Sequence, residues 1–190
     1  MLFAPDVPEG FSYREDFVTP AEEAELAAHI GAIQFDTFEM RGVVAKRRVA
    51  FFGMAYGEGP VRPMPAFLLP FRDRSAQWAD VEPDAFVMAL INEYRSGAPI
   101  GWHRDAPQYG IIAGLSLLSP CRMKLRPYVS PSALAKAAAR TPRKTTHEIL
   151  LEPRSGYLMK GKARSDFEHS IPAVDALRYS ITFRTLRRGR

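Results

Sequence analysis

The strongest constraint on the fold is the texture of the chain after Pro83, where short apolar runs follow one another between turn residues. Glycine, proline, serine or charged residues separate these runs, a pattern typical of strands. The runs are FVMALINEY, IIAGLSLLS, RMKLRPYV, HEILLEP, SGYLMKG and RYSITFRTL. Residues 84–186 are therefore predicted to form a β-rich unit of several strands.

The first part of the chain predicts two helices. Thr19 suits the N-cap of a helix near residues 20–30, because Pro20 stands at its first position and two glutamates follow in its first turn. A second amphipathic helix is expected within residues 67–81, where Pro70 limits its extent. The fold class is thus predicted to be α+β and mainly β.

A basic cluster interrupts the β-branched and aromatic residues of segment 42–56. We interpret this segment as short strands joined by a basic turn made of Lys46, Arg47 and Arg48. Such a turn could contact phosphate, although a solvated hairpin tip has the same composition. A second basic stretch, at 130–146, is expected to be a short Ala-rich helix or a loop between strands.

Length and composition limit the class of protein. At 190 residues the chain has the size of a single domain, 1–190. Its 46% hydrophobic and 25% charged residues are ordinary globular proportions, which excludes disordered and collagen-like classes. The single cysteine, Cys121, excludes an internal disulfide framework and a cysteine-rich zinc module. We expect a reducing, cytoplasmic location.

Charge and hydropathy bear on the partners. The net charge is +5 and arginine supplies 20 of the 26 basic residues, which suits a polyanionic partner and bidentate contacts to carboxylate or phosphate. No window of about 18 consecutive apolar residues exists, so no membrane span is expected. The N-terminus lacks the pattern of a signal peptide, and no obligate protein partner is indicated.

A candidate metal site begins with His103 and Asp105. In an extended segment, residues two apart point to the same face, so the imidazole and the carboxylate can converge on one ion. Two histidines and one carboxylate hold Fe(II) on one face and leave other positions open. His169, in a strand-like segment 64 residues after Asp105, is the candidate third ligand. His147 lies beside the basic stretch and His29 belongs to the upstream helix, so both suit the role less well.

The last apolar run carries two arginines, Arg178 and Arg184, six residues apart. Strand alternation places them on one face together with Ser180 and Thr182, opposite the apolar side chains of the same run. Two guanidinium groups on one face could bracket a short dicarboxylate. A solvated strand edge in an arginine-rich chain is the alternative.

The candidate residues follow one another in a characteristic order. An apolar run ends in Asn-x-Tyr, and then come His-x-Asp, the second histidine and the two arginines. This series resembles the AlkB family of iron(II)- and 2-oxoglutarate-dependent dioxygenases. The likeness covers about residues 84–186 and includes ALINEYRSGAPIGWHRD, GLSLLSP, RSGYLMKGKARSDFEHSIP and LRYSITFR, with a fainter match at RRVAFFG.

The resemblance implies a fold and a division of the chain. AlkB-like enzymes have a double-stranded β-helix, or jelly roll, whose mouth holds the iron. Residues 84–186 would form this catalytic core, and residues 1–83 would form an N-terminal extension of helix and strand that binds the substrate. The extension would carry a candidate nucleotide-recognition hairpin.

The resemblance also implies roles for single residues. Fe(II) would be held by His103, Asp105 and His169. The co-substrate 2-oxoglutarate would pair with Arg178 through its distal carboxylate, while Arg184 would guard its metal-bound end. Its remaining hydrogen bonds would come from Asn92 and Tyr94. Oxygen would be the second co-substrate.

The implied reaction is oxidative demethylation of N-alkylated nucleobases in DNA or RNA, with release of formaldehyde and succinate. In repair members of the family an acid two positions after the metal aspartate reads the base, but this chain has Pro107 there, followed by Gln108. Because such enzymes take the base out of its stack, aromatic side chains are candidates for contacting it. The candidate substrate residues are Lys46, Arg47, Arg48, Phe51, Phe52, Trp102 and Gln108.

Other functions remain open at this point. Because position 107 is a proline and not an acidic residue, the same chemistry on another target, such as a protein side chain or a tRNA modification, is favoured. A non-catalytic nucleic-acid-binding jelly roll would explain the charge but not the intact ligand set. A zinc hydrolase is the least favoured, because no glutamate stands beside the histidines as a base.

Overall fold

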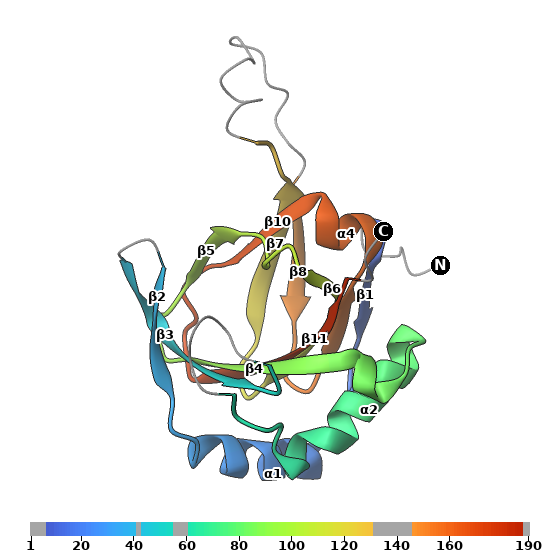
Figure 1. Ribbon diagram of the computed structural model, residues 1–190. Coiled ribbons are helices and arrows are strands. Elements are labelled where there is room, and N and C mark those ends of the chain that lie inside the picture. Colours follow the sequence, from blue (N-terminus) through green and yellow to red (C-terminus); the bar gives the residue numbers. More distant parts are fainter. Residues whose placement is uncertain (1–6, 41–42, 55–60, 131–145, 188–190) are drawn as a thin grey trace.

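The computed structural model describes residues 7–40, 43–54, 61–130 and 146–187. Their strands form two antiparallel sheets that face each other (Figure 1). The larger sheet contains, in spatial order, β1 (Phe11–Arg14), β9 (Gly156–Met159), β6 (Tyr109–Leu117), β11 (Arg178–Leu186), β4 (Phe86–Tyr94), β3 (Val43–Phe52) and β2 (Asp36–Met40). The smaller sheet contains β5 (Ile100–His103), β10 (Phe167–Ile171), β7 (Cys121–Pro127) and β8 (His147–Leu151).

Helices cover the outer face of the larger sheet (Figure 1). They are α1 (Pro20–Gly31) and α2 (Leu69–Ala79), and the 3₁₀ turns η1 (Ala66–Leu68) and η2 (Pro83–Ala85) flank α2. A short helix, α4 (Gly161–Ser165), precedes β10. Within the described residues, no helix is long and apolar enough to cross a membrane.

The predicted start of the first helix is confirmed. The Thr19 hydroxyl accepts a hydrogen bond from the Glu22 backbone N–H at 3.2 Å, and the Thr19 backbone N–H donates to the Glu22 carboxylate at 2.8 Å. This reciprocal capping box satisfies two N–H groups that the helix itself leaves unpaired. Leu26 and Ile30 form the buried face of α1, while His29 is exposed.

Two apolar clusters lie on opposite faces of the larger sheet. One fills the space between the sheet and the helices and includes Leu26, Phe71 and Phe183. The other lies between the two sheets and includes Met123 and Tyr157. The larger sheet is therefore buried on both faces, and the inter-sheet space is where polar side chains also gather.

The structure corrects one sequence prediction and adds to another. The prediction of a basic turn is wrong. Lys46, Arg47 and Arg48 lie inside the continuous strand β3, and because side chains alternate along a strand, neighbouring members of this group point to opposite faces. The N-terminal strand β1, which was not predicted, pairs with β9 at the sheet edge. The basic stretch predicted as helix or loop, 130–146, lies outside the described residues except for its first and last residue.

The predicted strands of the β-rich half are confirmed, and β4 and β11 have the bounds of the predicted apolar runs. The division at residue 83 stays a prediction. Strands from both sides of that position share one sheet, because β3 pairs with β4 and β1 pairs with β9.

Candidate active site

The two predicted histidine ligands are cross-strand neighbours in the smaller sheet. His103 ends β5 and lies directly opposite His169 of β10, with ring centroids 4.3 Å apart. Asp105 lies two residues after His103, and its carboxylate lies next to the two imidazole rings. The nearest ligand atoms of the three residues lie within 4.8 Å of one another. The structure thus brings together the three residues that the sequence proposed as metal ligands.

Both imidazoles are held in the form that binds a metal. His103 Nδ1 lies 2.9 Å from the Gly101 carbonyl oxygen, so Nδ1–H donates there and Nε2 keeps its lone pair. Burial lowers the pKa of His103. Burial, with His103 as a neighbour, lowers the pKa of His169 to about 3. The rings are therefore neutral near physiological pH, as metal ligation requires.

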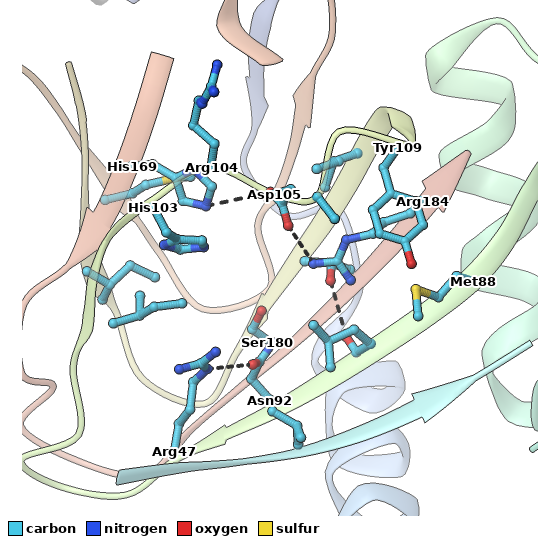
Figure 2. Close-up of a pocket in the computed structure, with 18 of the residues that line it drawn as sticks. Arg47, Met88, Asn92, His103, Arg104, Asp105, Tyr109, His169, Ser180 and Arg184 are labelled. Carbon is cyan, nitrogen blue, oxygen red and sulfur yellow. Dashed lines mark hydrogen bonds and ion pairs between the residues drawn. The ribbon is translucent and has the colours of Figure 1, made fainter. Parts of the chain in front are cut away.

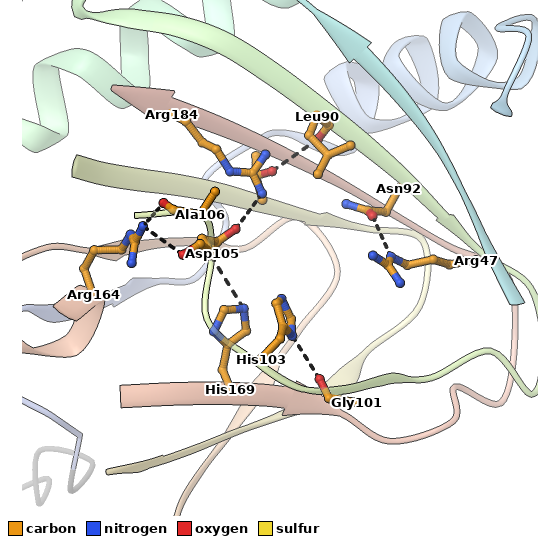
Figure 3. Close-up of polar contacts among 11 residues, drawn as sticks. Arg47, Leu90, Asn92, Gly101, His103, Asp105, Ala106, Arg164, His169 and Arg184 are labelled. Carbon is orange, nitrogen blue, oxygen red and sulfur yellow. Dashed lines mark hydrogen bonds and ion pairs between the residues drawn. The ribbon is translucent and has the colours of Figure 1, made fainter. Parts of the chain in front are cut away.

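The carboxylate of Asp105 is kept ionised and oriented by arginines (Figure 3). Burial alone would raise the pKa of Asp105, but Arg184 and the two imidazoles hold it well below its usual range. Arg184 Nη2 donates to Oδ1 at 2.8 Å, while Oδ2 lies 3.8 Å from His169 Nε2. Arg164 donates to the carbonyl oxygens of Asp105 and Ala106 at 3.3 and 2.6 Å. The loop that carries Asp105, the ligand loop, is thus held in place by Arg184 and by Arg164.

A cavity of about 110 Å³ opens from this cluster into the space between the sheets (Figure 2). Its polar part includes Asn92, Ser180 and Arg184, and its apolar walls include Ile100, Met123 and Ile171. Two nitrogen ligands and one oxygen ligand on one side of an open cavity match the donor set that suits Fe(II). The residues present therefore fit an iron ion and leave room beside it for a small co-substrate.

The residues expected to bind 2-oxoglutarate lie on the inner face of the larger sheet. Asn92 and Tyr94 line the cavity from β4. Arg178 is not among the residues that line the cavity; it is almost fully buried, with its guanidinium carbon 5.1 Å from the centre of the Tyr94 ring. Its Nε donates to the Ser116 hydroxyl at 3.1 Å, and its Nη1 has no hydrogen-bond partner among the described residues. Arg184 lies beside Asp105, at the metal end of the cavity.

The residues expected to contact the substrate are not all at the cavity. Arg47 and Phe51 line it from β3, whereas Phe52 points to the opposite face and packs in the helix-side core. Trp102 lies outside the cavity and packs against the Arg126 guanidinium at 4.0 Å. The remaining candidates, Lys46, Arg48 and Gln108, are also absent from the cavity walls.

Sequence reasoning missed two side chains that shape the site. Arg164 belongs to the short helix α4, whose sequence gives no sign that it reaches the ligand loop. Tyr157 lines the cavity and lies flat against β6, opposite Gly114. A Cβ atom at Gly114 would lie only 2.2 Å from the Tyr157 ring, so glycine is required for this close approach. A glycine in a strand was the one signal that pointed to it.

Comparison with known proteins identifies the family. The family model of the 2OG-Fe(II) oxygenase superfamily matches residues 53–184. The chain belongs to the 2OG-Fe(II) oxygenase superfamily. It shares 29% identity over 195 residues with the Alkylated DNA repair protein ALKBH8 homolog of Arabidopsis thaliana, over 91% of this chain and 54% of that protein.

A second relative is also named as an AlkB homologue. Over 71 residues the chain is 45% identical to the mouse (Mus musculus) Alpha-ketoglutarate-dependent dioxygenase alkB homolog 7, mitochondrial, covering 36% of this chain and 27% of that protein. The chain thus spans about half of the Arabidopsis relative and about a quarter of the mouse relative.

Solved structures share the fold. OsALKBH1 superposes with a TM-score of 0.69 at 14% identity, covering 94% of this chain and 99% of that one. A Pseudomonas putida prolyl-4-hydroxylase gives a TM-score of 0.62 at 12% identity, covering 95% and 94%. The AlkB-like double-stranded β-helix predicted from the sequence is confirmed. The predicted cofactor set of this superfamily, Fe(II), 2-oxoglutarate and O₂, is confirmed with it.

Proposed function

We propose that this oxygenase removes an alkyl group from a nitrogen of a nucleobase in DNA or RNA and releases formaldehyde and succinate. The observation that carries the proposal is the close cluster of His103, Asp105 and His169 on the wall of the inter-sheet cavity. The substrate is supported by the Arabidopsis relative, whose name describes alkylated DNA repair. The basic composition of the chain also suits a polyanionic substrate.

The ligand cluster would hold Fe(II) through one nitrogen of each histidine and the Asp105 carboxylate. An iron ion held there, together with 2-oxoglutarate and O₂, would supply oxidation of a substrate C–H bond coupled to conversion of 2-oxoglutarate to succinate and CO₂, and an N-methyl group oxidised in this way would be released as formaldehyde. Arg184 keeps Asp105 ionised and in place. The apolar part of the cavity wall would limit the access of water to the reacting carbon.

The co-substrate would lie along the inner face of the larger sheet. Asn92 and Tyr94 offer hydrogen bonds from β4. We assign the distal carboxylate to Arg178, since this buried guanidinium has a free Nη1 and no carboxylate partner among the described residues. A charged hydrogen bond made in a buried site discriminates strongly in favour of a dicarboxylate.

A second candidate is the same chemistry on another target, a protein side chain or a modified tRNA. It is favoured by Pro107, which is exposed and offers no acid where the repair members have one. A non-catalytic nucleic-acid-binding module is disfavoured by the intact ligand cluster and by the family to which the chain belongs.

The test measures succinate and formaldehyde together, with oligonucleotides that carry N-methylated bases and with unmodified ones. We expect formaldehyde in proportion to succinate only with methylated bases, and neither product from His103→Ala. Arg122→Gln, which changes an exposed arginine of β7 paired with Glu148, should behave like wild type. Succinate without formaldehyde from any methylated oligonucleotide would favour the second candidate.

A further inference from the structure

An open groove lies next to the cavity, on the other side of the ligand loop. Tyr109 lines the cavity, and the next residue, Gly110, lines the groove. The walls of the groove are α4, the start of β6, the end of β11 and the segment that follows α2. Its volume is about 1240 Å³, which gives room for an extended chain and not only for a single ion. None of its residues is assigned to the metal or to the co-substrate.

The groove is basic. The described residues that line it include four cations and one acid, namely Lys160, Lys162, Arg164, Arg187 and Asp80. Lys162 is paired with Glu9, whose Oε2 lies 2.6 Å from Nζ. The other three cations form no ion pair with a carboxylate among the described residues. The described part of the lining therefore carries a net positive charge.

Arg164 is the most buried of these cations, with 5% of its surface exposed. Its Nη2 donates to the carbonyl oxygens of Asp105 and Ala106 at 3.3 and 2.6 Å (Figure 3). Its Nε has no hydrogen-bond partner among the described residues. A buried donor without a partner costs free energy, and a guanidinium suits the oxygens of a phosphate group. Arg164 thus brings an unused donor to the wall of the groove.

Arg187 also connects the groove to the ligand loop. Its backbone N–H donates to the Gln108 carbonyl oxygen at 2.8 Å, and its Nε donates to the Tyr109 carbonyl oxygen at 3.3 Å. The residue is exposed to solvent at the groove. The two arginines of the groove therefore hold the same loop that supplies Asp105 to the candidate iron site. A ligand bound to them lies directly behind this loop.

Charge and position together favour a strand of nucleic acid as the occupant. Apolar side chains lie between the cations of the groove, including Val81, Val87, Ile111 and Leu186. A nucleic-acid strand presents regularly spaced phosphates that are joined by less polar sugars, so it complements such a mixed surface. A base that enters the cavity stays attached to its strand, and the strand must continue along the surface beside the cavity. The basic groove adjoins the cavity at the ligand loop.

We propose that this groove binds the phosphate backbone of the strand whose modified base enters the cavity, through Lys160, Arg164 and Arg187. The inference rests on the proposed function and adds a second binding surface to it. Phosphate contacts position a strand but carry no information on its sequence. The groove therefore holds strands of any sequence, and the modified base is recognised in the cavity alone.

The experiment measures the binding of a short, unmodified, single-stranded oligonucleotide by fluorescence anisotropy at a series of salt concentrations. Bound phosphates release counterions, so the logarithm of the affinity falls with the logarithm of the salt concentration by about 0.7 for each phosphate contact. Lys160→Gln should lower the affinity about threefold to tenfold and reduce this slope by about 0.7. Adding Arg187→Gln should cause a second loss of similar size. Arg164 is left unchanged, because it also holds the ligand loop.

Arg122→Gln is the matched control. It also removes one positive charge from an exposed side chain, but Arg122 lies on β7 of the smaller sheet and does not line the groove. The affinity and the salt slope of this variant should equal those of wild type. Equal losses in Arg122→Gln and Lys160→Gln would overturn the proposal, because they would show that net charge and not the groove binds the strand.

Two further results would contradict the proposal. A wild-type affinity that does not change with salt would show that the strand makes no phosphate contacts, and this result does not depend on any variant being folded. A polyglutamate peptide of the same charge might compete as a second polyanion; if it displaced the labelled strand as well as an unlabelled oligonucleotide does, the groove would be a general site for acidic polymers.

Release of formaldehyde from methylated oligonucleotides tests the proposed function separately. If formaldehyde is released but Lys160→Gln keeps the wild-type affinity and slope, the assignment of the groove fails and the proposed function stands. If no methylated oligonucleotide releases formaldehyde but the groove variants lose affinity, the proposed function fails and the groove is still supported as a surface that binds nucleic acid.

Discussion

The two faces of the larger sheet are formed by the same strands, but one is apolar and the other is polar. In β11, Tyr179, Ile181 and Phe183 point to the helices and pack in an apolar core. The alternate side chains of the same strand are polar, are equally buried, and face the smaller sheet: Arg178, Ser180, Thr182 and Arg184. One face therefore stabilises the fold, and the other holds buried polar groups that the fold alone does not require.

The polar face contains groups that lower the stability of the fold but can bind a ligand. Buried polar atoms normally find partners, because an unsatisfied one costs free energy. On the inner face, Arg178 Nη1 and Arg184 Nε have no hydrogen-bond partner among the described residues, and the same is true of His169 Nδ1 on the smaller sheet opposite. Such groups are typical of a binding site, where a ligand completes the network. The comparison predicts that substitutions on the two faces will fail in different ways.

The largest effect is expected on the helix-side face. Phe183 is fully buried and packs against Phe86, with ring centroids 6.1 Å apart. Phe183→Ala should lower the free energy of unfolding by about 3–5 kcal/mol, because it removes a large apolar side chain and leaves a cavity. Urea denaturation measures this change. A loss below about 1 kcal/mol would show that the apolar face is not the stabilising one.

On the inner face, Arg178→Met should separate binding from stability. The affinity for 2-oxoglutarate should fall roughly tenfold to a hundredfold, because a charged hydrogen bond is lost. The free energy of unfolding should stay the same or rise by up to about 2 kcal/mol, because a buried guanidinium without a carboxylate partner is removed. The KM for 2-oxoglutarate and a urea titration test both parts. A variant that loses stability and keeps its KM would reverse the assignment.

A smaller effect concerns the helices that cover the apolar face. Arg74 of α2 donates to Glu22 of α1 at 2.6 Å and, as the main cause, lowers the pKa of Glu22 to about 2 from an ordinary 4.5. A lowered pKa means that the stabilisation is complete above pH 4.5 and is lost as the pH falls towards 2.

Glu22→Gln should therefore be less stable than wild type by about 1 kcal/mol at neutral pH, a value that allows for solvent screening and includes the weakened cap. Thermal melts from neutral to acid pH should show the two curves converging below pH 4.5. A difference in Tm that does not shrink in acid would mean that the ionised pair is not its source.

The smallest effect is expected for Thr182→Val on the inner face. The Thr182 hydroxyl donates to the Leu90 carbonyl at 3.3 Å, a long hydrogen bond between neighbouring strands. Its loss should cost about 1 kcal/mol of unfolding free energy or less, since the shape of the side chain is conserved. A guanidinium chloride titration measures it. A loss as large as that of Phe183→Ala would contradict the division of roles between the faces.

The sequence predicted best where a local pattern decides the structure. The apolar run that became β4 and the alternation along β11 were readable, because both repeat every two residues. Thr19 and Glu22 gave the start of α1. His103 and Asp105 could be placed on one side because only two residues separate them, and order along the chain supplied His169.

The rest depended on contacts between distant residues. The sequence could not show which face of the sheet Arg47 and Arg48 point to. The carboxylate that Arg48 binds, Glu93, is 45 residues away along the chain. Arg164 reaches the ligand loop across 58 residues. The strand β1 is four residues long and has its partner at the far end of the chain, so its sequence alone reads as a loop.

The most direct test of the site between the two sheets is an anaerobic titration with Fe(II) followed by 2-oxoglutarate, recorded in the visible range. We expect one equivalent of iron to give a charge-transfer band when 2-oxoglutarate is added. His103→Ala should show no band, whereas Arg122→Gln should match wild type. Absence of the band in folded wild-type protein would contradict the assignment of His103, Asp105 and His169 as the iron site.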